Sequence, residues 1–233
     1  MPASQAVHAV SQYGCRIFLD ICCGIQPPLS KAVQALKGDL LRFDILLHLA
    51  DDLLDDNSFE KLLRVCASGI VGYAAASPSC CEYSRLKLRP GGPPALRTPE
   101  FLAGRPDLTG PQLLKVQESN MMLERCVQCL CLVISSGGHA HLEQPSSAMS
   151  WEEPVVQQYI IRESCICVAI AACCFGRDWS KTWMLASTFS GLEQLACSCP
   201  HPAGTRQPIA GAISSTGQFV SRQIDGSISR AAR

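Results

Sequence analysis

Short apolar runs recur along the chain and are separated by polar or glycine- and proline-rich stretches. Residues 15–21, 40–47 and 70–76 form three such runs in the first third of the chain. Apolar runs of this length with turn residues at both ends predict buried strands. Further runs predict strands at the positions listed here: residues 138–142, 165–174 and 183–187.

Amphipathic segments lie between these runs and predict helices. In the longest, apolar residues recur every three or four positions from Leu113 to Ile134, with Asn120 at the one missing step. This spacing predicts a helix that begins at Pro111, ends before Gly137 and buries one face. Shorter helices are predicted at residues 29–36, 59–66 (with Ser58 as the N-cap), 152–161 and 191–196.

The alternation of strands and helices predicts an α/β fold with a mostly parallel sheet and helices on both faces. We expect residues 1–202 to form a single domain. Residues 203–233 are rich in Gly, Ser, Thr and Gln, and we expect a weakly ordered tail there. Residues 87–111 contain six prolines and four glycines, which predicts a long loop that is functional or mobile.

Charge gives no whole-chain signature of nucleic-acid binding, because 20 basic and 20 acidic residues balance. A nucleic-acid partner would need a local basic patch. The best candidates follow the third strand, and the alternative for all of them is a solvated loop: Arg85, Lys87, Arg89 and Arg97.

Fifteen cysteines occur largely as close pairs inside apolar runs. Free cysteine packs as a small hydrophobe, and residues 1–11 lack the apolar core of a signal peptide. We therefore expect mostly buried thiols in a reducing, intracellular compartment. No apolar stretch approaches the ~18 residues of a membrane span, so we expect no membrane partner.

Two cysteine groups have spacings found in metal sites, although we expect no metal at either. Cys126 and Cys129 have a Cys-x-x-Cys spacing but lie within the long predicted helix, without a second pair. Cys197, Cys199 and His201 could bind a metal with one more donor, but three ligands within five residues strain a tetrahedral site.

A candidate catalytic pair follows two of the predicted strands. Pro78 and Cys80 come directly after the strand at residues 70–76, and Glu143 follows the strand at 138–142. Open α/β sheets place their chemistry at the carboxyl ends of parallel strands, so we expect the thiol and the carboxyl group to lie close together. Such a pair suits nucleophilic attack on an electron-poor ring.

Four stretches, in this order, resemble motifs of the S-adenosylmethionine-dependent DNA cytosine-C5 methyltransferases, especially their small, divergent members in phages and mobile elements. Residues 18–24 look like the first, cofactor-binding turn, and residues 77–80 look like the Pro-Pro-Cys motif. Residues 142–145 are similar to the Glu-Asn-Val or Glu-Asn-Pro motif, and residues 175–182 look like a glycine-to-lysine segment before a late strand. The resemblance implies a Rossmann-like methyltransferase fold and S-adenosylmethionine as the cofactor.

The resemblance also implies roles. Cys80 would add to C6 of a cytosine flipped out of DNA, and Glu143 would hold the ring and favour protonation at N3. The site residues that it further implies fall in two groups. Cofactor-binding residues are Asp20, Cys23, Gly24, Asp44, Asp55 and Pro78, and substrate-binding residues are Ser84, Arg85, Lys87 and Lys181. In a eukaryote such an enzyme would be nuclear.

Departures from the family pattern leave two other functions open. Ser79 and Gln144 stand where the family has proline and asparagine, and the turn after Gly24 lacks a second glycine. These changes suit a catalytically eroded remnant that acts as a binding module. A methyltransferase for another acceptor, such as RNA, is the third possibility, because the cofactor half of the fold does not encode the acceptor.

Overall fold

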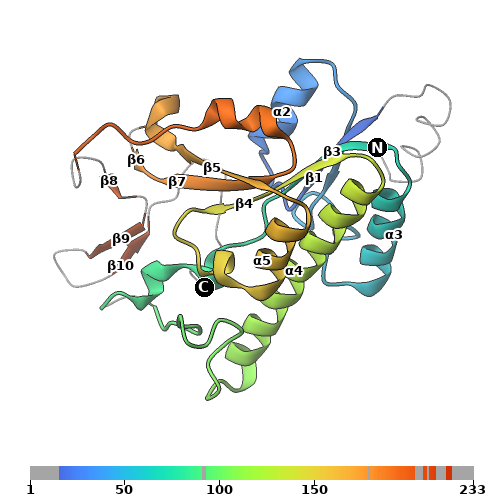
Figure 1. Cartoon of the computed structure of the whole chain (residues 1–233). Helices are drawn as coiled ribbons and strands as arrows, with labels where there is room; N and C mark the ends of the chain where they lie inside the picture. The colour runs from blue at the N-terminus through green and yellow to red at the C-terminus, as the bar shows by residue number, and fades with distance from the viewer. Residues whose placement is uncertain are drawn as a thin grey trace.

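Six strands form one mixed sheet in the order β2-β1-β3-β4-β7-β5 in the computed structural model (Figure 1). The structure describes residues 16–90, 93–177, 179–202, 207–208, 210–213 and 219–221. The sheet strands are β1 (Ile17–Ile21), β2 (Leu40–Phe43), β3 (Val71–Ala76), β4 (His139–Pro145), β5 (Ile166–Ala171) and β7 (Thr182–Ser187).

The sheet is mostly parallel, as the sequence predicts. β1 pairs in parallel with β2 and β3, and β3 pairs in parallel with β4. β7 is antiparallel to both β4 and β5 and lies between them. It can reverse direction because only a 3-10 turn, η4 (Ala172–Phe175), and the short strand β6 (Trp179–Ser180) separate it from β5.

Helices cover both faces of the sheet, as predicted. α2 (Pro28–Ala35) lies in the connection from β1 to β2, which runs toward the β2 edge of the sheet. The connections that run toward the β5 edge contain the other helices: α3 (Asp56–Ala67), α4 (Gly110–Ser135) and α5 (Pro154–Arg162). Right-handed crossovers therefore place α2 on one face and the other three on the opposite face. Figure 1 shows α3, α4 and α5 side by side on that face.

The main core lies between the sheet and α4. α4 buries Leu123, Cys126, Val127, Leu130 and Val133 against β3 and β4. The first turns of α4 extend beyond the sheet, and there the sequence pattern is wrong, since Leu113 is 38% exposed. At the missing apolar step, the Asn120 side chain accepts a hydrogen bond from the Tyr83 hydroxyl and donates one to the Ala103 carbonyl.

Three predicted boundaries are corrected by local hydrogen bonds. Asp55, not Ser58, is the N-cap of α3: its Oδ1 accepts from the Ser58 backbone amide at 2.8 Å, while the Ser58 hydroxyl donates to the Ala50 carbonyl. β2 ends at Phe43 because the Asp44 side chain accepts from the Leu46 amide and starts a turn. β5 ends at Ala171, before η4.

The loop between η2 (Arg85–Leu88) and α4 contains a buried arginine, which corrects the prediction of a surface patch. The Arg97 side chain is fully buried, and its guanidinium carbon lies 4.0 Å from the centre of the Tyr83 ring. It donates to the Leu102 carbonyl and, at 3.2 Å, to the Val116 carbonyl, and it pairs with Glu153 at 3.4 Å. These contacts hold the loop against α4 and α5.

No disulfide joins the cysteines that the structure describes, and most of them are not buried, contrary to the prediction. Cys66, Cys126 and Cys129 are fully buried. Cys167, Cys174 and Cys199 are exposed, and the others are half-buried. Cys126 and Cys129 lie on the buried face of α4 and pack in the hydrophobic core.

The segment after the sheet contains η5 (Ser190–Leu195) and short strands. β8 (Gln207–Pro208) pairs with β6, and β9 (Ala210–Ile213) pairs with β10 (Phe219–Ser221). The remainder of the predicted tail at residues 203–233, like residues 1–11, lies outside the described residues. Among the helices that the structure describes, the 26-residue α4 included, none could cross a membrane.

His141 is buried on the face of the sheet opposite α4, and its burial predicts that the fold is less stable in acid. The His141 ring bonds the Tyr73 hydroxyl at 2.9 Å, and burial lowers the pKa of His141 to about 4. Below the ordinary pKa of about 6.5, the unfolded chain binds a proton that the folded chain does not. The free energy of unfolding should therefore fall by ~2 kcal/mol between pH 7 and pH 5 through this group.

Urea denaturation at the two pH values measures this difference. His141→Gln should remove most of the pH-dependent loss, whereas His139→Gln, at an exposed position on the same strand, should keep it. Equal pH dependence in all three proteins would contradict the assignment.

Candidate functional site

The turn after β1 is hydrogen-bonded to the residue that follows β2, so it lies at the carboxyl ends of both strands. Two of its residues, Cys22 and Gly24, have positive φ values of 56° and 74°. The Gly24 amide donates to the Asp44 Oδ2 at 2.7 Å, and the Leu46 amide donates to Oδ1 at 2.8 Å. A Cβ atom at Gly24 would meet no atom within 4 Å, so the backbone here is open to a ligand.

Carboxylates converge on this turn. Asp20 is buried at the end of β1, and its Oδ2 accepts from the Ser30 hydroxyl at 2.5 Å. Burial, with the charge of Asp44 adding to it, raises the pKa of Asp20. Burial also raises the pKa of Cys23 to about 12, with the charges of Asp20 and Asp44 as further causes. The structure therefore brings three predicted cofactor residues, Asp20, Cys23 and Asp44, together with the fourth, Gly24.

The position of the turn in the sheet also favours a ligand. The chain leaves β1 toward β2 on one side, and the connection from β2 then crosses back to β3 on the other side of β1, so the direction of the connections reverses here. Open α/β sheets bind ligands in the crevice at such a switch point, outside the carboxyl ends of the strands.

The loop that carries Cys80 is fixed to the strands on both sides. The Ser77 amide donates to the Ile21 carbonyl at 3.1 Å, which holds the loop beside the end of β1. The Gln144 side chain is buried; its Nε2 donates to the Pro78 carbonyl at 2.5 Å, and its Oε1 accepts from the Ser150 hydroxyl at 3.3 Å. Gln144 is thus an anchor of the cysteine loop.

Glu143 and Lys181 lie close enough to Cys80 for their charges to affect its pKa. Burial raises the pKa of Cys80 to about 11; the charges of Cys81 and Glu143 add to this rise, and Lys181 opposes it. Burial raises the pKa of Glu143 as well, opposed by Lys181 and by a hydrogen bond from Ser77. The three side chains come from the loop after β3, from β4 and from the residue before β7.

The alkylation rate of Cys80 should report these contacts. Because the thiolate is the reactive form, the rate with iodoacetamide should rise about tenfold per pH unit from pH 7 to pH 10. Glu143→Gln should shift the profile to lower pH, and Lys181→Met should shift it to higher pH. Mass spectrometry of the Cys80 peptide measures the rate, and unchanged profiles in both variants would contradict the arrangement.

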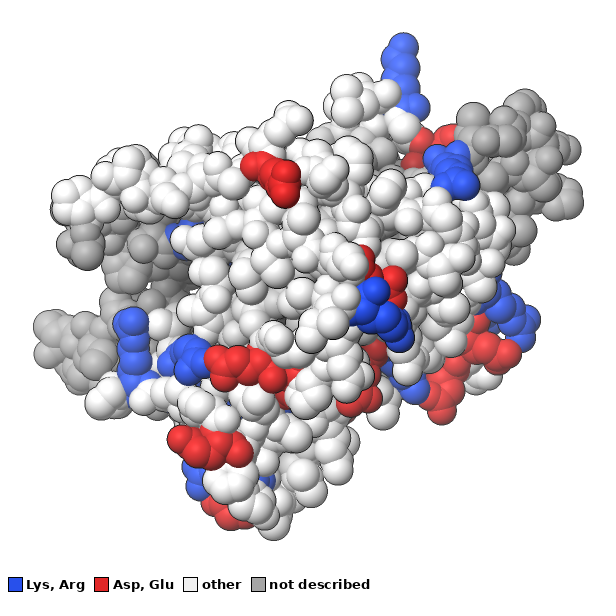
Figure 2. Space-filling view, in the orientation of Figure 1, with Lys and Arg blue, Asp and Glu red and all other residues white. Residues whose placement is uncertain are grey.

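The other predicted residues have structural partners. Asp55 caps α3, and the Ser84 side chain caps η2. Arg85 pairs with Glu152, and Lys87 pairs with Glu82 at 2.7 Å. Figure 2 shows basic and acidic residues next to each other on this face. The basic residues predicted for substrate binding after Cys80 are therefore already neutralised by acidic partners.

The sequence did not predict that Ser77 would bond to Glu143 or that Gln144 would anchor the cysteine loop. The usable signal was the alternation along β4: Glu143 faces away from the α4 side, whereas Leu142 is part of the core there. A buried glutamine next to a proline-containing loop needs partners, and the loop carbonyl is one of them.

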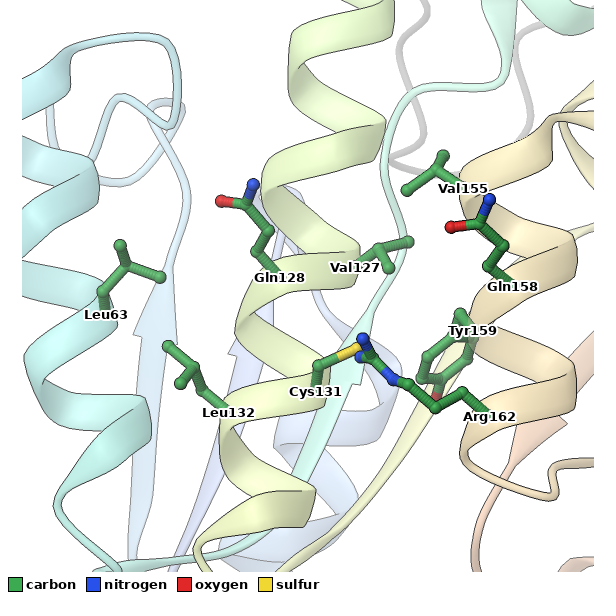
Figure 3. A pocket seen from close by; sticks show the side chains of 9 residues that line it. All are labelled: Leu63, Val127, Gln128, Cys131, Leu132, Val155, Gln158, Tyr159 and Arg162. Carbon is green, nitrogen blue, oxygen red and sulfur yellow. The ribbon is translucent and has the colours of Figure 1, made fainter.

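The main cavity described lies elsewhere. About 370 Å³ in volume, it is lined by side chains of α3, α4 and α5, among them Leu63, Val127, Val155 and Tyr159 (Figure 3). None of its lining residues belongs to the site at the carboxyl edge. The candidate site therefore rests on the convergence of side chains at the switch point and not on a closed cavity.

Comparison with known proteins gives no relative: no protein-family model, curated protein or solved structure matches the chain.

Proposed function

We propose that this protein transfers a methyl group from S-adenosylmethionine to C5 of cytosine in DNA, through a covalent bond from the Cys80 sulfur. One observation carries the proposal: the charges of Glu143 and Lys181 act on the Cys80 thiol, and the loop that carries Cys80 is hydrogen-bonded to the end of β1, beside the turn of Asp20 and Gly24. The chain would have a Rossmann-like methyltransferase fold. In support, the sheet is mostly parallel and helices cover it, as the resemblance implies.

The residues at the turn suit the cofactor. S-adenosylmethionine carries a positively charged sulfonium, and the neighbouring carboxyl groups of Asp20 and Asp44, both buried, offer opposite charge. Each oxygen of Asp44 accepts one backbone hydrogen bond and keeps a lone pair for a ribose hydroxyl. Gly24 allows a ligand to approach the backbone closely. When bound, the cofactor supplies an electrophilic methyl group.

The chemistry balances with these groups. The Cys80 thiolate forms a bond to C6 of the ring, and the electron pair of the C5–C6 double bond moves to C5. C5 takes the methyl group as the methyl–sulfur bond of the donor breaks. The C5 proton then leaves to a base, the C6–sulfur bond breaks, and the thiolate and the aromatic ring are restored.

The raised pKa values give each residue a role. Burial raises the pKa of Glu143 and so favours its protonated form, which can donate a proton to N3 of the ring and make C6 more electrophilic. Cys80 must lose its proton, and the Lys181 ammonium favours the thiolate. The thiol therefore becomes reactive when the substrate and Lys181 are in place. The target base must be flipped out of the duplex to reach Cys80.

A non-catalytic binding module is the second candidate. Burial of the Cys80 thiol, with its pKa at about 11, and the ion pairing of Arg85 and Lys87 favour it. Cofactor binding without transfer to any acceptor would support this candidate over the enzyme.

Calorimetric titration with S-adenosylmethionine, followed by transfer of a labelled methyl group to DNA or RNA, tests the proposal. Asp20→Asn removes one carboxylate charge and should weaken cofactor binding by roughly tenfold, or about 1.4 kcal/mol. Asp39→Asn, at an exposed position before β2, is the matched control and should bind as the wild type does. Absence of cofactor binding by the wild type would overturn the proposal, and transfer to RNA alone would reassign the acceptor.

A further inference from the structure

A second group of chemically reactive side chains lies at the end of β5, outside the proposed catalytic site. Cys173 is in η4, and Cys199 and His201 follow η5. One ligand atom from each of the three lies within 4.8 Å of the other two. Cys199 and His201 are separated by 3.5 Å between Sγ and Nδ1.

The backbone holds the two segments side by side. Cys197 forms a bridge with Ile170 of β5: its amide donates to the Ala169 carbonyl, and its carbonyl accepts from the Ala171 amide, both at 3.1 Å. The segment that carries Cys199 is therefore fixed to the strand that leads directly into Cys173.

We propose that Cys173, Cys199 and His201 bind a zinc ion. Two cysteine sulfurs and one imidazole nitrogen are ligands that zinc prefers, and hard cations such as Mg²⁺ and Ca²⁺ take oxygen ligands instead. Binding displaces the protons of the two thiols, and the neutral imidazole contributes a lone pair. This goes beyond the methyltransferase proposal and does not depend on it.

The spacing of the ligand atoms agrees with tetrahedral zinc. With Zn–S of about 2.3 Å and Zn–N of about 2.0 Å, a tetrahedral angle separates sulfur and nitrogen by about 3.5 Å, and two sulfurs by about 3.8 Å. Cys199 and His201 are already at the first of these distances. The third ligand, within 4.8 Å, needs to move by about 1 Å at most.

Two more thiols lie beside the three ligands and can supply the fourth. The Cys174 thiol lies within hydrogen-bonding reach of the Cys197 and Cys173 thiols. The Cys174 thiol also donates to the Ser198 carbonyl at 3.5 Å. Either thiol, once deprotonated, would give zinc a third sulfur ligand.

The sequence could show only part of this site. Cys197, Cys199 and His201 lie within five residues and lack a distant donor, which is why the pattern alone favours no metal. The fold supplies that donor: Cys173 precedes β7 in the chain and Cys199 follows it, and pairing with β5 brings the two segments together. The Ala172 amide donates to the Lys181 carbonyl at 2.8 Å, so a zinc ion here would also stiffen the backbone that carries Lys181.

Metal content and cobalt spectroscopy of the full chain test the proposal. Protein purified with a non-thiol reductant should contain about one zinc ion per chain by mass spectrometry of the metal. Cobalt added to metal-free protein should give the visible absorption of a tetrahedral site and a sulfur-to-cobalt charge-transfer band. Cys199→Ser and His201→Gln should each weaken cobalt binding by at least ~10-fold, since even loss of an indirect partner costs that much.

Cys167→Ser removes an exposed thiol from β5 itself and is the matched control, with unchanged binding expected. Circular dichroism of each variant checks that the fold is kept. Two results would overturn the proposal: no metal bound by the wild type at micromolar cobalt or zinc, or equal binding by Cys199→Ser, His201→Gln and Cys167→Ser. Neither result bears on cofactor binding at Asp20 and Gly24, so the two proposals fail independently.

Discussion

Replacement of Cys80 by serine should abolish methyl transfer, by at least ~10³-fold, and leave S-adenosylmethionine binding unchanged. A serine hydroxyl has a far higher pKa than a thiol and is a weaker nucleophile toward C6 of the ring. The cofactor turn lies at the neighbouring strand end and does not include the Cys80 side chain. A labelled-methyl assay with DNA measures the first effect, and calorimetric titration measures the second.

The adjacent cysteine supplies a control. Cys81 is half-buried like Cys80, but it begins η1 (Cys81–Tyr83), which packs against α4. Cys81→Ser should keep most of the activity. It should also keep the covalent adduct with an oligonucleotide that contains 5-fluorocytosine, which cannot lose the C5 substituent and so holds the enzyme. Cys80→Ser should form no adduct, and an adduct of equal yield in that variant would refute the role of Cys80.

The neighbouring strand ends that carry Cys80 and Glu143 were predictable from the sequence because they follow from two local patterns. The apolar run before Pro78 and the one before Glu143 each predict a buried strand, and parallel neighbours end at the same edge. The structure pairs these two strands in parallel, with Ala76 opposite Leu142, so the loop that carries Cys80 and the residue Glu143 lie at the same edge of the sheet.

Other features depend on partners that are remote in the sequence. Gln144 is one residue from Glu143, yet it points to the opposite face and binds the Pro78 carbonyl. The antiparallel direction of β7 follows from its short connection to β5. The apolar pattern of β7 itself is the same for a parallel and an antiparallel strand, so the direction could not be predicted from it. The burial of Arg97 could not be predicted because it depends on Glu153 and on two carbonyls that tertiary packing brings to it.

Replacement of Arg97 by methionine should destabilise the fold by ~3–5 kcal/mol. Methionine fills much of the same volume but leaves the Glu153 carboxylate, only 10% exposed, without its cation. It also removes the donors to the Leu102 and Val116 carbonyls and the contact with the Tyr83 ring. Breaking a buried ion pair from one side costs more than the pair contributes, because the remaining charge stays desolvated.

Urea denaturation measures this effect, with Arg89→Met as the control. Arg89 is exposed in the same loop, and its replacement should change the free energy of unfolding by less than ~0.5 kcal/mol. Because Glu153 carries the uncompensated charge, the double variant Arg97→Met, Glu153→Gln should recover part of the loss. Burial raises the pKa of Glu153, and Arg97 opposes this rise. Without Arg97 the carboxyl group is protonated more readily, so Arg97→Met alone should regain stability as the pH falls. A pH-independent loss equal to that of Arg89→Met would show that Arg97 is not the buried partner of Glu153.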